Sequence, residues 1–307
     1  MLGIQNIASY IPKESIDNLE QADRFVTDRE FVEQKIGVSS LPRFSESDTV
    51  VRACSEAFQN LCKKESIESS EIECVVLCTQ NPDGGGLPHN SALIHAELGL
   101  PEDCACFDIG LGCSGYVYGL SVIQSFMLAN GMKKGLLFTC DPYSRILNPE
   151  DKNTCLLFGD AAAVTLISDT PRYTLDGAKF STKGSGGRAL QKVDGQLEMN
   201  GRAVFNFALQ DVPKQIKGLL EKTELKTEDI DLFLLHQGSR FMLENTIKRA
   251  GIPPEKAPID LAETGNTVSS SIPLLLEKEL ANSPNKILMS GFGVGLSWAS
   301  AIYKLVK

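Results

Sequence analysis

The glycine-rich sequence Phe107-Asp-Ile-Gly-Leu-Gly-Cys-Ser-Gly115 joins an apolar run of strand length to a stretch of helical length, residues 116–130. Gly112 and Gly115 permit a tight turn and close helix packing, because glycine has no Cβ to obstruct either. The sequence therefore predicts a strand, a turn and a helix, with Cys113 at the N-terminal end of the helix.

Short apolar runs alternate with longer amphipathic ones around this turn, which favours an α/β fold with buried strands. In the first part of the chain we expect strands at residues 74–78, 104–111, 135–140, 154–158 and 161–168. The second part repeats this order, with a helix at 271–280 and apolar, strand-like runs at residues 230–235, 257–262, 286–290 and 298–306. The repetition predicts a duplicated fold with halves 1–170 and 171–307. The alternative is an α/β fold without duplication, since strands and helices alternate along any α/β chain.

Two glycine-rich segments interrupt the alternation. Residues 182–201 contain Gly184-Ser-Gly-Gly187, which predicts a loop or excursion between the halves rather than a core element. The sequence Asp83-Gly-Gly-Gly86 follows the first of the expected strands. It predicts a flexible loop at a position where ligand-binding loops are common.

The composition argues against several classes of function. Thirty Lys and Arg residues against 39 Asp and Glu residues give a net charge of −9, which disfavours nucleic-acid binding. Nine cysteines without a CxxC pair, and only three histidines, predict neither a disulfide framework nor a metal site. We find no secretory signal and no apolar run of about 18 residues, so we expect a reduced, cytoplasmic protein with no membrane span.

Cys113 is the first candidate for chemistry. The positive end of a helix dipole favours thiolate over thiol, and backbone amides nearby can hold an oxyanion. A nucleophile on such a turn is therefore one interpretation. The other is a small buried residue, which is what we expect for the remaining eight cysteines.

His236 and Asn266 are the second and third candidates. His236 ends an apolar strand and points into the crevice that the strand ends share. Asn266 lies in a turn that corresponds, in the internal repeat, to the turn of Cys113, and an amide there can donate to a developing negative charge. The alternatives are a structural histidine and an ordinary Gly-Asn turn.

The sequence Gly291-Phe-Gly-Val-Gly-Leu-Ser-Trp298 is a further glycine-rich loop after a strand. It has neither the GxxxxGK[ST] pattern nor a GxGxxG pattern that opens a helix, so it is not a phosphate-binding loop. Its glycines allow backbone amides to approach a ligand closely.

Together these motifs resemble those of the β-ketoacyl-acyl carrier protein synthases III, in the thiolase superfamily. The resemblance spans nearly the whole chain and rests on ordered motifs: the 107–115 turn, Phe158-Gly-Asp-Ala-Ala162, His236-Gln237, Gly265-Asn266-Thr267 and the 291–298 loop. It implies a duplicated thiolase-like fold, a five-layer αβαβα sandwich, and a homodimer.

The resemblance also implies a catalytic triad of Cys113, His236 and Asn266. The backbone N–H groups of Cys113 and Val294 would form the oxyanion hole. The implied reaction transfers an acyl group from an acyl thioester to Cys113 and condenses it with malonyl-acyl carrier protein, with loss of carbon dioxide. The implied substrates are acyl-CoA or acyl carrier protein thioesters, and no cofactor is implied.

Six side chains match substrate-binding positions of the family: Phe31, Lys35, Leu87, Lys152, Ser239 and Phe292. Several depart from the common family residues. Phe31 replaces a tryptophan, and Lys152 replaces an arginine that would stack on adenine. A carrier-protein-bound donor is therefore an alternative to coenzyme A. Leu87 corresponds to a gate residue that acts across the dimer, so we do not expect acetyl as the primer.

Arg240, Lys248 and Arg249 lie on the predicted helix after His236. In an acidic chain they are candidates for docking an acidic carrier protein, and the alternative is a solvated helix face. Two other functions remain open: an acyltransferase that moves the acyl group to a hydroxyl or amine, and a non-catalytic partner subunit. Asn266 argues for condensation, and the complete triad argues against the non-catalytic subunit.

Overall fold

Nine strands form the main sheet of the computed structural model, which describes residues 1–306. They are β1 (Gly3–Tyr10), β4 (Cys74–Cys78), β5 (Ala105–Ile109), β6 (Lys134–Cys140), β7 (Ala162–Ser168), β8 (Tyr173–Thr182), β11 (Leu232–Leu235), β12 (Lys286–Gly293) and β13 (Ser297–Leu305). Their order in the sheet is β11-β12-β13-β8-β1-β7-β6-β4-β5. Two small sheets pair β2 (Ser15–Asp17) with β3 (Ser40–Pro42), and β9 (Leu190–Val193) with β10 (Gln196–Met199).

The α-helices of this part of the chain are α1 (Asn18–Arg24), α2 (Val50–Cys62), α3 (Asn90–Glu97), α4 (Gly115–Ala129), α5 (Lys152–Cys155), α6 (Gly201–Lys222), α7 (Arg240–Ala250) and α8 (Ser271–Glu279). A short π-helix forms η1 (Phe31–Ile36). Single 3₁₀ turns form η2 (Ser69–Glu71), η3 (Asp83–Gly86), η4 (Tyr143–Ile146), η5 (Gly184–Ala189), η6 (Thr227–Asp229), η7 (Pro254–Lys256), η8 (Val268–Ser270) and η9 (Leu280–Asn282).

The strand order confirms the predicted duplication. In the first part of the sheet β4 runs parallel to β6, and β6 runs antiparallel to β7. In the second part β11 and β12 repeat the parallel pair, and β12 and β13 the antiparallel pair. The two parts join where Gly3 and Ile4 of β1 pair with β8. The division into units at 170/171 falls between β7 and β8 and stays a prediction.

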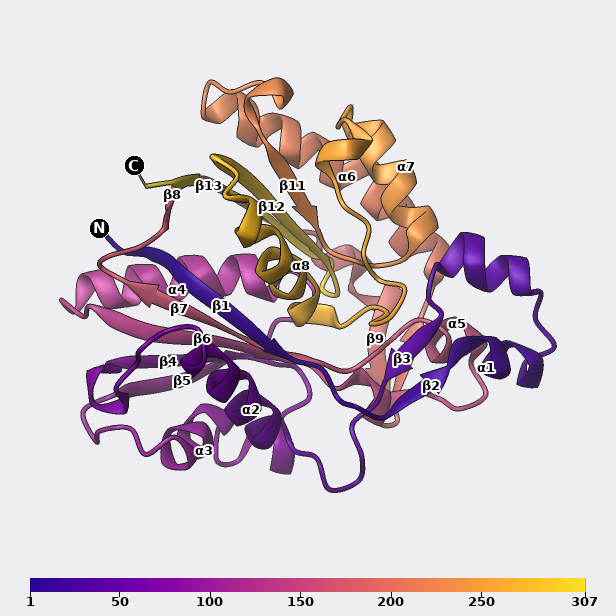
Figure 1. The fold of residues 1–307 in the computed structure, drawn as a ribbon. Coiled ribbons are helices and arrows are strands. Elements are labelled where there is room, and N and C mark those ends of the chain that lie inside the picture. Colours follow the sequence, from indigo (N-terminus) through magenta and orange to yellow (C-terminus); the bar gives the residue numbers. More distant parts are fainter. Residues whose placement is uncertain (307) are drawn as a thin grey trace.

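Helices and sheets alternate in five layers (Figure 1). Helices α2 and α3 pack on the outer face of the first part of the sheet, and α6 packs on the outer face of the second part, with α7 against it. Helices α4 and α8 lie between the two parts, and their buried side chains form one cluster with strands of both. This arrangement is the predicted αβαβα sandwich.

The central helix α4 is apolar nearly all round, as its sequence GYVYGLSVIQSFMLA shows. A helix of this kind must be buried on several faces. Helix α7 instead has one buried face, and the Ser239 side chain caps it by accepting the Met242 N–H. Its other end is Gly251, in the left-handed conformation that glycine adopts without strain.

Two strand predictions are wrong. Residues 154–158 do not form a strand, because Asp151 caps α5 by accepting the Asn153 N–H. Residues 257–262 also lack a strand, since Pro258 has no N–H for a ladder. There the side chain of Gln237 accepts the Asp260 N–H at 2.9 Å in place of a neighbouring strand.

Residues 183–200 lie outside the main sheet, as predicted, but they are not only loop: they contain η5 and the β9–β10 hairpin, whereas Thr182 is the last residue of β8. Within residues 1–306, no helix is both long and apolar enough to cross a membrane.

Candidate active site

Cys113 lies in the turn between β5 and α4 and is 4% exposed. Two glycines of β12 pack directly against it. A Cβ on Gly293 would come within 2.7 Å of the Cys113 Sγ, and one on Gly291 within 2.7 Å of the Cys113 carbonyl oxygen. The turn that carries Cys113, in the first half, therefore packs directly against the backbone of β12 in the second half. Only glycine permits this close approach, because any Cβ would collide.

Two backbone N–H groups, those of Val294 and of Cys113 itself, face the Cys113 sulfur. They are the two predicted oxyanion-hole donors. Burial, reinforced by the Asp141 carboxylate, nevertheless raises the pKa of the Cys113 thiol to about 12. Burial therefore opposes the thiolate that the helix N-terminus is expected to favour.

His236 follows β11 and is 3% exposed. Its Nδ1 lies 2.7 Å from the Ser271 Oγ, whereas that hydroxyl is 3.1 Å from the Val268 carbonyl oxygen. Ser271 has one hydroxyl proton, which serves either the Val268 carbonyl or Nδ1, and in the second case the ring proton lies on Nε2. Burial lowers the pKa of His236 to about 3, so the ring is neutral and one of its two nitrogens carries a proton to donate.

Asn266 is fixed by backbone and side chain together. Its N–H donates to the Leu157 carbonyl at 2.9 Å, and its carbonyl accepts the Gly159 N–H at 3.1 Å. Its side-chain Oδ1 accepts the Val268 N–H at 2.9 Å. Because the amide oxygen is engaged in this way, Nδ2 is the end of the amide that can donate to a reacting group.

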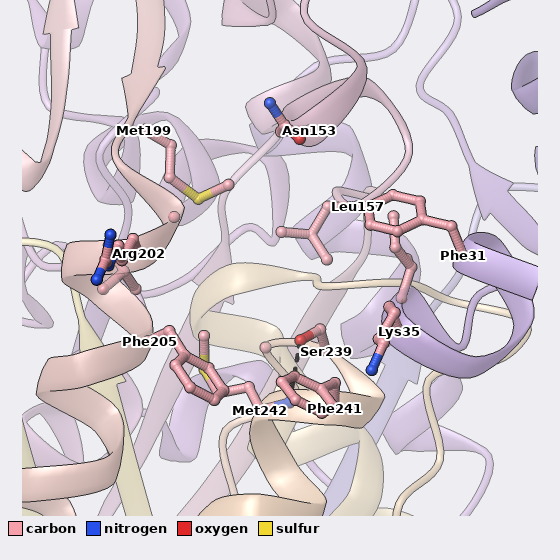
Figure 2. A pocket seen from close by; sticks show the side chains of 14 residues that line it. Phe31, Lys35, Asn153, Leu157, Met199, Arg202, Phe205, Ser239, Phe241 and Met242 are labelled. Carbon is pink, nitrogen blue, oxygen red and sulfur yellow. Dashed lines mark hydrogen bonds between the residues drawn. The ribbon is translucent and has the colours of Figure 1, made fainter. Parts of the chain in front are cut away.

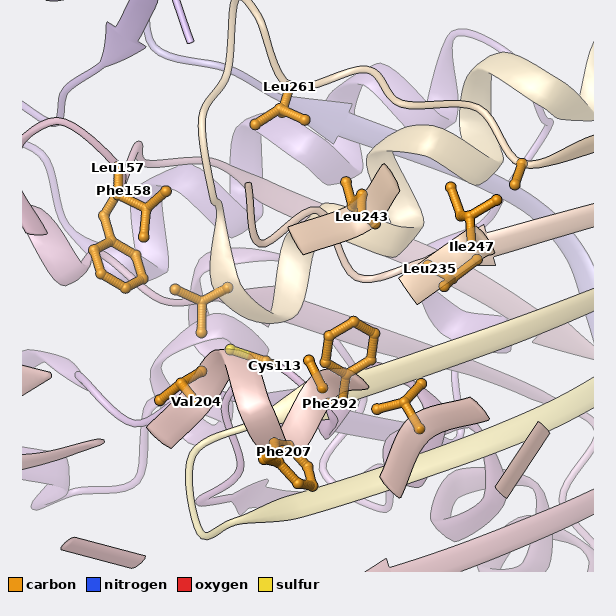
Figure 3. Close-up of a cluster of buried hydrophobic side chains, with 14 of the residues drawn as sticks. Cys113, Leu157, Phe158, Val204, Phe207, Leu235, Leu243, Ile247, Leu261 and Phe292 are labelled. Atoms are coloured by element: carbon orange, nitrogen blue, oxygen red, sulfur yellow. The ribbon is translucent and has the colours of Figure 1, made fainter. Parts of the chain in front are cut away.

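Shared neighbours bring the three side chains together. The Phe292 ring stands perpendicular to the His236 ring at 5.6 Å between centroids. Gly293 and Val294, the next two residues, contact the sulfur of Cys113. Figure 3 shows Cys113 beside Phe292 in the buried cluster that surrounds them. Cys113 and His236 are thus connected through residues 292–294, and Asn266 is connected to His236 through Val268 and Ser271.

A pocket of about 400 Å³ lies next to this site (Figure 2). Helix η1 lines it on one side, the β10–α6 connection on another, and the start of α7 on a third. Its most prominent side chains are Phe31, Lys35, Leu157, Met199, Arg202, Phe205, Ser239, Phe241 and Met242. A pocket with aromatic walls and a few cationic groups suits a thioester arm that carries a phosphate.

Four of the predicted substrate-binding residues lie at this pocket. Phe31, Lys35 and Ser239 line it. Lys152 stands at its edge, with its Nζ 5.7 Å from the centroid of the Phe31 ring. The Lys35 Nζ lies 4.0 Å from the centroid of the Phe241 ring.

The remaining predicted positions lie elsewhere. Phe292 is 2% exposed and packs behind His236 rather than on the pocket wall. Leu87 is 89% exposed, on the loop after Gly86. Lys248 and Arg249 are exposed on α7, whereas Arg240 is half-buried: it packs on Gly37, and its Nε is buried.

Sequence reasoning missed part of the pocket wall. Met199, Arg202 and Phe205 come from the end of the 182–201 segment and the start of α6. The apolar spacing of residues 204–220 was the signal that could have revealed this helix. Asp141 was missed as well, although it follows a buried strand as His236 does. No group of metal-ligating side chains occurs in residues 1–306.

The fold defines a thiolase-like protein, and its site contains a buried cysteine on a turn packed against glycines of β12. Residues 107–184 match the family model "3-Oxoacyl-[acyl-carrier-protein (ACP)] synthase III". Residues 220–305 match the model of the C-terminal region of the same family.

Known proteins agree with these matches. Beta-ketoacyl-[acyl-carrier-protein] synthase III of Streptococcus mutans is 32% identical, over 98% of both chains. A crystal structure of 3-oxoacyl-(acyl-carrier-protein) synthase III superimposes with a TM-score of 0.93 at 32% identity, over 99% of both chains. A Burkholderia xenovorans synthase has a TM-score of 0.91 at 31% identity, over 99% of this chain and 94% of its own. The chain belongs to the 3-oxoacyl-[acyl-carrier-protein] synthase III family of condensing enzymes.

Proposed function

We propose that this protein joins an acyl group, carried as a thioester on Cys113, to malonyl-acyl carrier protein by decarboxylative condensation. The observation that carries the proposal is the seating of Cys113 between two backbone N–H groups, with His236 and Asn266 in the facing turns. In the broad sense the enzyme is an acyltransferase.

In the first step the Cys113 sulfur attacks the carbonyl carbon of the acyl donor. The N–H groups of Cys113 and Val294 hold the resulting oxyanion. The bond from the carbonyl carbon to the donor sulfur then breaks. The proton lost by the Cys113 thiol ends on the departing thiol, and the acyl group remains as a thioester on Cys113.

In the second step the malonyl thioester loses carbon dioxide. The breaking carbon–carbon bond leaves its electron pair as an enolate, whose oxygen accepts from His236 Nε2–H and Asn266 Nδ2–H. A neutral histidine suits this task, since it can donate without first taking up a proton. The enolate carbon attacks the acyl-Cys113 carbonyl, the thiolate leaves, and a proton from water restores the thiol.

The acyl donor is an acyl-CoA or an acyl carrier protein, and the pocket of Figure 2 receives its thioester arm. The exposed cations Lys248 and Arg249 on α7 support docking of an acidic carrier protein. No resident cofactor takes part in these steps.

We propose that the protein acts in the cytoplasm as a homodimer. The exposed side chain of Leu87 supports the dimer, because an apolar residue on an exposed loop gains from burial against a second copy. The reaction would serve fatty acid synthesis or a related acyl pathway.

The test is mass spectrometry of the protein with a panel of acyl-CoA and acyl-carrier donors, followed by malonyl-carrier protein. We expect one acyl adduct on Cys113 and then release of carbon dioxide with loss of the adduct. Cys113→Ala is the control and should take no label. Acylation without carbon dioxide release under any malonyl condition would instead establish transfer to a hydroxyl or amine acceptor. Absence of any label on Cys113 would refute both reactions.

A further inference from the structure

The turn that carries Asn266 is strained. Val268 has a φ of +53°, a left-handed conformation that β-branched residues rarely adopt, and its side chain is fully buried. The N–H of this residue holds the Asn266 amide, and its carbonyl lies against Ser271, the partner of His236. The orientation of both donors therefore depends on one strained residue, which persists only where its surroundings over-determine it.

Two buried serines, Ser269 and Ser270, fasten this turn to the first half of the molecule. The Ser269 hydroxyl donates to the Asp141 carboxylate at 2.6 Å. Ser270 Oγ lies 2.9 Å from Thr139 Oγ1 and also contacts the Ala161 carbonyl at 3.2 Å. Thr139 belongs to β6, and Asp141 and Ala161 adjoin β6 and β7.

Asp141 connects the turn onward to the region of Cys113. Its carboxylate accepts the Gln80 N–H at 2.6 Å and lies 3.4 Å from Thr79 Oγ1. The Gln80 side chain in turn accepts from Tyr143 at 2.6 Å and packs so tightly on Gly112 that a Cβ there would collide with it. Gly112 is the residue before Cys113. Hydrogen bonds thus run from the Asn266 turn through Asp141 to Gln80, which packs on the nucleophile turn.

We propose that Asp141, Ser269 and Ser270 are positioning residues that hold the Asn266–Val268 turn at the distance from Cys113 that condensation requires. This inference rests on the proposed function and adds residues that touch no substrate. Because they act on the donor side, their loss should slow enolate formation far more than acylation of Cys113.

The test measures the two steps separately in Ser269→Ala and Ser270→Ala. We expect carbon dioxide release from malonyl-carrier protein to fall by about 10- to 100-fold in kcat. The KM for malonyl-carrier protein and the rate of Cys113 acylation should stay within about twofold of the unmodified protein. Ser168→Ala is the matched control: Ser168 is equally buried and accepts the Thr170 N–H at 3.2 Å, at the other end of β7 from Ala161.

A double-variant cycle separates positioning from general damage. For Ser269→Ala, Asp141→Ala and the combined variant, the combined loss of carbon dioxide release should be smaller than the product of the two single losses, because both single variants remove the Ser269–Asp141 bond. Equal loss in both steps, or no loss in either, would overturn the positioning role. Ser270 bonds different partners, so Ser270→Ala tests the positioning role if Ser269→Ala does not fold. If the unmodified protein neither acylates Cys113 nor releases carbon dioxide, the proposed function itself is refuted.

Discussion

The two halves of the sandwich place equivalent turns at the site, yet the turns are built differently. The turn before α4 combines glycines with Cys113 and leads into an apolar helix of 15 residues. The turn before α8 combines Asn266, a strained valine and three serines, and its helix has nine residues. The first turn is set by close backbone packing, and the second by side-chain hydrogen bonds.

This difference follows from the chemistry that each turn performs. A nucleophile needs backbone amides close to its sulfur, and glycine allows such an approach. Donors to an enolate need fixed orientation, which buried hydrogen bonds supply. On the proposed function the first half supplies the nucleophile, and the second half supplies the enolate donors together with the Val294 N–H that faces the sulfur.

The largest effect we expect separates these two tasks. Cys113→Ala should abolish both steps, lowering product formation by about 10⁴-fold or more, because it removes the nucleophile. Asn266→Ala should leave acylation near its normal rate and lower condensation by about 10²- to 10³-fold, the cost of one charge-stabilising donor. Quantifying acyl-Cys113 by intact-protein mass spectrometry and carbon dioxide by trapping measures both. If Asn266→Ala slows acylation equally, the division of tasks is wrong.

The second prediction tests the packing of glycine on the nucleophile. Gly293→Ala should lower Cys113 acylation by about 100-fold, because the new Cβ would meet the sulfur at 2.7 Å and displace it from its amides. Rates of acylation by an acyl-CoA measure the effect. Gly110→Ala, in the nucleophile turn but with no atom near the added Cβ, should acylate normally. Similar rates for both variants would contradict the close approach.

The third prediction concerns pH. With a Cys113 pKa raised to about 12 by burial and by Asp141, the thiolate fraction should rise about tenfold per pH unit. Alkylation of Cys113 by iodoacetamide between about pH 6 and 9 should therefore climb throughout, with labelling of Cys113→Ala subtracted as background. A plateau near neutral pH would show a preformed thiolate and restore the importance of the helix dipole.

The smallest expected effect concerns residues 257–262, where the second half lacks the strand that the repeat predicted. Gln237→Ala should lower the free energy of unfolding by about 1–3 kcal/mol, because the buried Leu235 carbonyl loses its donor and the Asp260 N–H its acceptor. Urea denaturation measures this change. Gln210→Ala, at an exposed position of α6, should leave stability within about 0.5 kcal/mol. Equal stability of the two variants would show that the Gln237 side chain does not replace a strand.

Much of the fold was predictable because it depends on local pattern. The apolar run 74–78 is β4 at the predicted bounds, and 116–130 lies within one residue of α4. The same reasoning predicted strands at residues 154–158 and 257–262, and both predictions are wrong. In spite of the apolar side chains, a capping aspartate sets the backbone conformation of the first segment and a proline that of the second. The amphipathic helix α6 was overlooked, and with it the Arg202 side of the pocket.

The sequence by itself determined the candidate nucleophile, histidine and asparagine, because each follows an apolar run at a turn and the order of these turns repeats. It also determined the duplicated architecture, since periodicity reports which faces are buried. Only the tertiary structure decided the protonation states, because the pKa values of Cys113 and His236 depend on burial among residues distant in sequence. It alone decided that Arg240 packs on Gly37 and that Asp141 bonds the Asn266 turn, because such contacts exist only once distant segments have come together.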